Sequence, residues 1–454
     1  MKKKFSVLIA FLLVFVMVAA CGDSGTPSTQ TPGTTEPGTS EPGTTEPGTP
    51  AAPAGATTLT FWTFQQSHAT FLELMAESWN RENPGREVVI ESSVFGYDDN
   101  HNNLLISLQT GTGAPDMADI EISRFALFLA GEPQLYDFNA ELAPIEQYVI
   151  MSRMENYAKD GKYYGIDYHV GIPVIYYNAT ILASAGIDYM DIVTWEDFIQ
   201  AGLKLKEETG IPMATLEVTE HWSYYPLVTQ RGSDWFDGSG NVTLDSPANV
   251  DVLNMLYDMM YEYEIAVAAP GGFHHAEEWY GFMNGGGAAS VWMPQWFMNR
   301  FTDHMPDLKG DIVMRPLPLF GAGGSFGAGM GGTGTVVTNQ AGEPQLAKDF
   351  LVFAKLSQEG AIRTWTDLGF DPLRWDVWGL DVMKEPNVFT DYFGTGVFDM
   401  LLEMRDGLTA IHLDERFPAA TTLVQSQVVF RVLDARDMTA QEALTAAAAE
   451  LRAH

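Results

Sequence analysis

Apolar and polar positions alternate in a way that predicts strands and amphipathic helices in turn near residue 60. The segment 59–64 is rich in Thr and aromatic residues, as strands are. Apolar side chains then recur at helical spacing from Phe71 to Ser78. Further strands are predicted over 87–93 and 116–122, and a helix over 102–109. This alternation is typical of an α/β domain with a mostly parallel sheet, whose ligands bind beyond the carboxyl ends of the strands.

Further along, the pattern becomes more helical. The segment 165–178 is rich in β-branched and aromatic residues, which predicts one long extended stretch. Helices are expected to begin at Thr194, at Ser246-Pro247 and at Glu343-Pro344, since Thr and Ser favour N-caps and Pro favours the first helical turn. The apolar stripes of these helices indicate core packing rather than contacts to a cofactor.

Residues 1–56 have a different composition. Three lysines are followed by an apolar run over 5–18 and then by Ala19-Ala20-Cys21. This order predicts a secretory signal peptide over residues 1–20. Residues 22–56 repeat the unit Glu-Pro-Gly-Thr and contain few large apolar side chains, which predicts a disordered tether.

Val18-Ala19-Ala20-Cys21 resembles the bacterial lipobox, in which the chain is cut before the cysteine and the cysteine receives lipid. The resemblance implies that residues 21–56 form a lipid anchor and tether, with Cys21 as the lipidated residue. The protein would then be held at the extracellular face of the cytoplasmic membrane. The alternative is a soluble secreted protein in which Cys21 has no special role.

Charge and cysteine content exclude several classes of protein. The 454 residues include 25 Lys and Arg against 59 Asp and Glu, a formal net charge of −34. Such an acidic surface repels phosphate backbones, so nucleic acid is not an expected partner. The chain has one cysteine, which provides neither an internal disulfide nor a cysteine-based zinc site.

Three further features of the sequence do not lead us to predict a nucleotide-binding, metal-binding or catalytic site. Gly327–Gly332 matches GxGxxG, but a strand follows at Thr335, whereas a dinucleotide site requires a helix there. We interpret residues 321–334 as a flexible connection.

His274-His275 beside Glu277-Glu278 fits an exposed polar turn better than a metal site. We therefore expect no cofactor and no metal. Carboxylate pairs suited to glycoside hydrolysis are too numerous to test from sequence.

Several segments together resemble the extracellular solute-binding proteins of bacterial ABC importers, family 1, in the carbohydrate-binding branch. The resemblance covers 57–454 and rests on the order of its motifs, which are FWT at 61–63, TGTGAPD at 110–116, GKYYGI at 161–166, VIYYN at 174–178, TWEDF at 194–198 and VWMPQW at 291–296. Three longer segments, 61–68, 116–125 and 160–169, are similar to the arabinose and arabino-oligosaccharide-binding lipoproteins.

This resemblance implies a two-lobed α/β fold of the periplasmic-binding-protein type II, with a hinge between the lobes. The N-terminal lobe would comprise 57–169 plus 335–371, and the C-terminal lobe 170–334 plus 372–454. The chain would cross between them near 169–171, 331–335 and 370–373. It departs from maltose-binding proteins at Gly171, where those proteins carry an acidic ligand contact, which argues against maltose-type recognition.

A sugar presents an apolar C–H face and a rim of hydroxyl groups, so its site needs aromatic rings beside planar polar groups. Trp79 and Trp195 lie on helical patterns and are predicted to be core residues. The candidate ring platforms stand in predicted loops or at strand ends and are Trp62, Trp222, Trp292 and Trp296, with Phe64 and Tyr225 beside them. The candidate polar partners are Gln65, His68, Glu121, Arg124, Asp167, His169 and Gln230.

We therefore expect a monomeric sugar-binding lipoprotein that delivers an arabinose-containing sugar or oligosaccharide to ABC permease subunits by hinge closure, and no enzyme. Two alternatives stay open. One is a cell-surface enzyme that processes glycosides, and the other is a binding protein for a ligand such as a peptide.

Overall fold

The computed structural model describes residues 55–321 and 323–453. The predicted signal peptide, Cys21 and almost all of the predicted tether lie outside these residues. No helix in the described part of the chain is long and apolar enough to cross a membrane.

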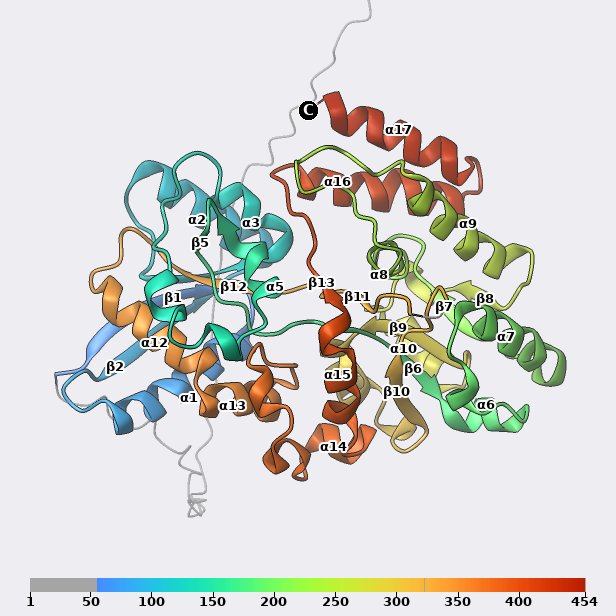
Figure 1. Cartoon of the computed structure of the whole chain (residues 1–454), viewed down its shortest axis with the longest axis horizontal. Coiled ribbons are helices and arrows are strands. Elements are labelled where there is room, and N and C mark those ends of the chain that lie inside the picture. Colours follow the sequence, from blue (N-terminus) through green and yellow to red (C-terminus); the bar gives the residue numbers. More distant parts are fainter. Residues whose placement is uncertain (1–54, 322, 454) are drawn as a thin grey trace, which may run out of the picture. The chain divides into compact units, whose positions relative to one another are not determined.

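The first sheet has four strands in the order β12-β3-β1-β2, of which β1, β2 and β12 are labelled in Figure 1. Its strands are β1 Thr57–Thr63, β2 Val88–Val94, β3 Met117–Glu121 and β12 Thr333–Val337. Strand β1 runs parallel to β2 and β3, and β12 pairs with β3 in the antiparallel sense. The predicted parallel arrangement of the first three strands is confirmed. The strand predicted after the glycine-rich segment is confirmed as β12, which stands where a dinucleotide fingerprint would require a helix.

Five helices accompany this sheet: α1 Gln66–Glu82, α2 Tyr97–Thr110, α3 Ile122–Phe128, α12 Pro344–Leu356 and α13 Gln358–Leu368. Helix α1 packs against β2 and α12. The prediction that α2 begins at Asn102 is wrong by five residues. It begins after Gly96, and Asp98 and Asp99 in its first turn lie near the unpaired N–H groups of the helix end, where negative charge is favourable.

The second sheet is antiparallel, in the order β10-β6-β9. Its strands are β6 Pro173–Asn178, β9 Ser290–Pro294 and β10 Ile312–Pro316. Alternate residues of β6 enter two different apolar clusters: Val174 and Tyr176 join one, and Ile175 and Tyr177 the other. Both faces of this strand are therefore buried, as the period of two along a strand requires.

Many helices surround the second sheet. They are α6 Ala179–Ser184, α7 Trp195–Thr209, α8 Tyr225–Gln230, α9 Pro247–Tyr261, α10 Glu277–Asn284, α11 Met298–His304, α14 Val388–Phe393, α15 Val397–Met404, α16 Phe417–Leu423 and α17 Ala440–Ala453. The predicted starts at Thr194 and Ser246 are confirmed, because each side chain caps its helix.

Shorter elements complete the chain. The strands are β4 Ala158–Lys159, β5 Lys162–Tyr163, β7 Ala214–Leu216, β8 Ala266–Ala268, β11 Gly327–Ala328 and β13 Leu408–Thr409, and the helical turns include α4 Asn139–Leu142 and α5 Met151–Met154.

Three segments that pass between the sheets are hydrogen-bonded to one another. The N–H of Met330 donates to the carbonyl of Gly171 over 2.8 Å, and the N–H groups of Gly171 and Ile172 each donate to the carboxylate of Asp371 over 3.0 Å. A side chain at Gly171, which has a φ of 71°, would collide with the carbonyl of Met330. The crossing segments are therefore packed backbone against backbone.

The prediction of one extended stretch over 165–178 is wrong for its first half, since β6 begins only at Pro173. Ile166 exchanges backbone hydrogen bonds with Thr335 of β12, whereas several of the N–H groups between Ile166 and β6 donate to carboxylates. Asp167 accepts from the N–H of Tyr168, and Asp371 accepts from Gly171 and Ile172. Side-chain acceptors thus replace most of the strand-to-strand hydrogen bonds that the β-rich composition of this segment predicted.

Candidate functional site

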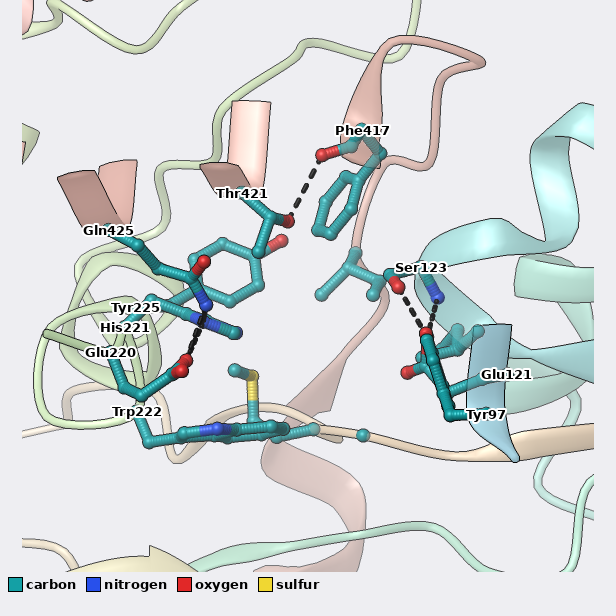
Figure 2. A pocket seen from close by; sticks show the side chains of 14 residues that line it. Tyr97, Glu121, Ser123, Glu220, His221, Trp222, Tyr225, Phe417, Thr421 and Gln425 are labelled. Atoms are coloured by element: carbon teal, nitrogen blue, oxygen red, sulfur yellow. Dashed lines mark hydrogen bonds and ion pairs between the residues drawn. The ribbon is translucent and has the colours of Figure 1, made fainter. Parts of the chain in front are cut away.

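A cavity of about 310 Å³ lies where residues from both groups of elements meet (Figure 2). Its lining consists of Tyr97, Glu121, Ile122, Ser123, Glu220, His221, Trp222, Tyr225, Met330, Gly331, Ile411, Phe417, Thr421 and Gln425. Figure 2 shows Glu121 and Ser123 on one side of the cavity and Glu220 and Gln425 on the other. Glu121 ends β3 and Gly331 shortly precedes β12, so the cavity lies at the carboxyl end of a parallel strand, as such sheets favour.

Glu121 is held firmly. Its carboxylate accepts from the Tyr97 hydroxyl at 3.0 Å, from the Ser123 N–H at 2.9 Å and from the Ser123 hydroxyl. Its own N–H donates to Nε2 of His101 at 2.9 Å, which leaves the proton of that ring on Nδ1, facing the carbonyl of Tyr97 at 2.7 Å. Burial raises the pKa of Glu121, although the hydrogen bonds from Ser123 and Tyr97 oppose this.

The opposite side is formed by the loop after β7 and by the C-terminal helices. Gln425 donates to Glu220 and lies 3.3 Å from Nδ1 of His221. It is the second residue of a π-helical segment, η10 Val424–Asp434, which continues α16 without a break. Wide turns of this kind occur frequently at functional sites because they redirect side chains.

Aromatic rings form the wall between these two sides. Trp222 stacks on His221 with ring centroids 4.7 Å apart and meets Trp296 edge to face at 5.4 Å. The indole N–H of Trp296 donates to the carbonyl of Met330 at 3.1 Å. Tyr225 is fixed by donation of its hydroxyl to Asp234 at 2.7 Å. These rings are therefore held at defined angles before any ligand arrives.

The chain matches the family model described as bacterial extracellular solute-binding protein over residues 62–361. The chain belongs to this family. An arabinooligosaccharide-binding protein of Halalkalibacterium halodurans is 46% identical over 88% of this chain and 90% of that protein. A protein of the same description from Bacillus subtilis is 45% identical over 88% of this chain and 93% of its own length.

Solved structures of more distant solute-binding proteins share the fold. The sugar-binding protein MalE of Xanthomonas citri has a TM-score of 0.72 at 18% identity and covers 87% of this chain and 96% of its own. The cyclic alpha-maltosyl-1,6-maltose binding protein of Arthrobacter globiformis has a TM-score of 0.69 at 20% identity, with coverage of 88% and 99%. The predicted two-lobed α/β fold and the predicted family are confirmed.

Four of the site residues predicted for this solute-binding protein lie together. Glu121, Trp222 and Tyr225 line the cavity, and Trp296 packs against Trp222 and bonds to the backbone that lines it.

The predicted residues near β1 and α3 lie outside the cavity lining, and two of them, Phe64 and Arg124, contact the lining residue Tyr97. Trp62 packs on Phe95 with centroids 5.2 Å apart, and Phe64 packs on Tyr97 at 5.3 Å. Arg124 pairs with Asp98 at 2.7 Å and covers the ring of Tyr97. His68 is buried against Asp119 at 2.8 Å, and Gln65 is exposed before the first turn of α1.

The other predicted residues are buried among protein partners. Asp167 pairs with Arg153, and His169 packs on Phe370. Gln230 accepts from the indole of Trp195, and the indole of Trp292 donates to the carbonyl of Ser223. Trp79 and Trp195 are each 3% exposed, so their assignment to the core is confirmed.

Residues missed from the sequence complete the cavity. Glu220 and His221 directly precede Trp222 in a predicted loop, and their polar side chains could have been predicted from the sequence as site residues. Phe417, Thr421 and Gln425 lie on one helix whose pattern resembles an ordinary surface helix. No local signal distinguishes them.

The lining contains two carboxylates and no Lys or Arg. It therefore offers acceptors and aromatic faces, which suit a ligand rich in hydrogen-bond donors and disfavour an anionic one. Among the described residues, no group of three or more His, Cys, Asp or Glu side chains is placed to hold a metal ion.

Proposed function

We propose that the protein binds an uncharged, arabinose-containing oligosaccharide in this cavity and delivers it to an ABC importer without catalysing a reaction. Two relatives of about 45% identity are arabinooligosaccharide-binding proteins, which supports the ligand class.

The chemistry of the lining carries the proposal. The C–H face of a sugar ring packs on Trp222 and Tyr225, while its hydroxyl groups donate to Glu121 and Glu220. Because no Lys or Arg faces these carboxylates from the lining, an acidic sugar would bring its own charge close to theirs. A uronate-bearing ligand is therefore disfavoured.

Titration calorimetry tests this proposal. Neutral arabino-oligosaccharides should bind, whereas the same chains carrying a uronate should bind at least about tenfold more weakly, since like charges in a partly dry site repel. Binding of a peptide or polyamine in place of any sugar would overturn the proposal. New reducing ends during incubation with the oligosaccharide would show an enzyme instead.

We further propose that the cavity closes as two lobes, 57–169 plus 335–371 and 170–334 plus 372–454, rotate about the crossing segments. Gly171 and Gly331, which have φ values of 71° and 66° and lie on two of the crossing segments, support a hinge there, since glycine tolerates large changes of φ and ψ.

We also propose a lipid anchor at Cys21 that holds the protein at the extracellular face of the membrane as a monomer near its permease. The support is the order of basic, apolar and small residues before this single cysteine.

A further inference from the structure

Glu217 is a fully buried carboxylate directly after β7, and it does not line the cavity. Its Oε2 accepts from the N–H of Trp222 at 2.9 Å, and its Oε1 accepts from the N–H of His274 at 3.0 Å. Its own N–H donates to the hydroxyl of Ser223 at 2.9 Å. One side chain thus joins the loop that carries the aromatic wall to the loop before α10.

A chain of polar groups leads to this carboxylate from the core. The indole of Trp279 donates to the hydroxyl of Thr215 at 3.0 Å, and that hydroxyl lies 3.1 Å from Nε2 of His274. If the hydroxyl donates to Nε2, the ring proton is on Nδ1, 3.6 Å from Oε1 of Glu217. The opposite tautomer would direct a lone pair at the carboxylate. The prediction that His274 lies in an exposed turn is wrong: the ring is buried, and its Nε2 faces the hydroxyl of Thr215.

We propose that Glu217 is a positioning residue for ligand binding, which fixes the backbone of Trp222 and thereby the angle of the aromatic wall. This inference rests on the proposed function. Glu220 and His221 lie on the same short loop, so a shift of this backbone would displace three lining residues together. Removing the carboxylate would also leave a buried N–H without an acceptor.

The position of Glu217 makes the wall sensitive to pH. Burial raises the pKa of Glu217 to about 8; the charge of Glu220 adds to this, while the N–H groups of His274, Trp222 and Ser223 oppose it. The ionised carboxylate accepts from both loops, whereas the protonated group turns an O–H toward one of the two N–H donors. Ligand affinity should therefore increase as the pH rises through about 8.

The other titratable groups on these two loops are Glu220, His221, Tyr224, His274 and His275, and burial raises the pKa of Tyr224, which keeps its hydroxyl protonated. Burial lowers the pKa of His274 to about 3 and that of His275 to about 4, so both rings are neutral near pH 8. Glu220 and His221 are retained in a Glu217 variant, so the difference between the two pH profiles measures the effect of replacing Glu217, including its effect on the neighbouring Glu220.

The test is calorimetry of the whole protein with a neutral arabino-oligosaccharide, for the wild type and for Glu217→Gln. Between about pH 6.5 and about pH 9.5 the wild-type affinity should rise about tenfold, the worth of one hydrogen bond to a charged group. The affinity of Glu217→Gln for the oligosaccharide should stay close to the low value of the wild type at about pH 6.5 across the whole range. Glu217→Asp, which keeps the charge, should restore part of the rise.

Asp116→Asn provides the matched control. Asp116 also accepts from backbone N–H groups, those of Thr60 and Gly342, each at 2.8 Å, but it is not a lining residue. This variant should keep the wild-type profile. A Glu217→Gln profile that coincides with the wild type, or a Glu217→Asp profile as flat as that of Glu217→Gln, overturns the positioning role. A wild type that binds no sugar at any pH overturns the proposed function itself.

Discussion

Arg153 and Asp167 form a buried ion pair, with Nε 2.7 Å from Oδ2 and side chains 2% and 0% exposed. The remaining N–H groups of Arg153 donate to the carbonyl of Gly329 at 3.1 Å and to that of Gly331. The other oxygen of Asp167 accepts from the N–H of Thr333 at 3.0 Å. The pair therefore fixes the crossing segment that contributes Gly331 to the cavity.

Asp167→Asn should destabilise the fold by about 3–5 kcal/mol, because it leaves the guanidinium of Arg153 buried without its partner. Urea unfolding near neutral pH measures this loss. Asp399→Asn, which removes the exposed partner of Lys384, is the control and should cost less than about 1 kcal/mol. Equal losses in the two variants would contradict a stabilising role for the buried pair.

The same carboxylate predicts a pH dependence of stability. Burial by itself would raise the pKa of Asp167, but the charge of Arg153 and hydrogen bonds from Tyr157 and Thr333 outweigh it and lower the pKa from 3.8 to about 2. The stabilisation is fully present above about pH 4 and is lost as the pH falls through about 2. Unfolding midpoints measured across this window should fall more steeply for the wild type than for Asp167→Asn.

Trp222→Ala should weaken oligosaccharide binding by about tenfold or more while the protein stays folded, since an aromatic contact contributes roughly 0.5–1.5 kcal/mol beyond its buried area. Calorimetry measures the affinity, and circular dichroism checks the fold. Trp375→Ala is the matched control, because this half-buried indole bonds to the carbonyl of Gln147 and does not line the cavity. Unchanged affinity in Trp222→Ala would place the ligand elsewhere.

Local patterns predicted the secondary structure better than the site. Thr194 and Ser246 define helix starts through bonds to residues three positions away, which a sequence displays directly. Residues 170–172 do not form the predicted strand because their N–H groups bond to Asp371, about 200 residues further on. The cavity residues differ in the same way in how far the sequence predicts them. Glu121 was inferred from its place at the end of a strand, whereas Gln425 lies in a π-helical segment that no local pattern indicates.

Ligand should reduce the radius of gyration if the proposed lobes close upon it. A ligand shifts such an equilibrium only by its differential affinity for the two states, and the closed state alone offers Glu121 and Trp222 together. Small-angle scattering with and without saturating arabino-oligosaccharide measures the change, and a sugar that calorimetry finds not to bind is the control. Identical curves, with binding confirmed separately, would leave a rigid site.

Cys21→Ser should move the protein from the membrane fraction to the soluble fraction of the cells that produce it. The reason is that the thiol is the proposed point of lipid attachment, and the chain has one cysteine. Fractionation and immunoblotting measure the distribution. A variant that stays with the membrane after its signal peptide has been removed would place the anchor elsewhere.

The π-helical segment that carries Gln425 has a consequence for how such proteins change over time. A π-helical turn holds about one residue more than an α-helical turn. Loss of a single residue from 426–434 would convert a wide turn of this segment into an ordinary α-helical turn. Gln425 stands at the start of the segment, so the direction of its side chain toward the cavity would change although no lining residue had been replaced. The shape of the proposed ligand site can thus change through loss of one codon, and two chains with identical lining residues but unequal helix lengths need not share a ligand.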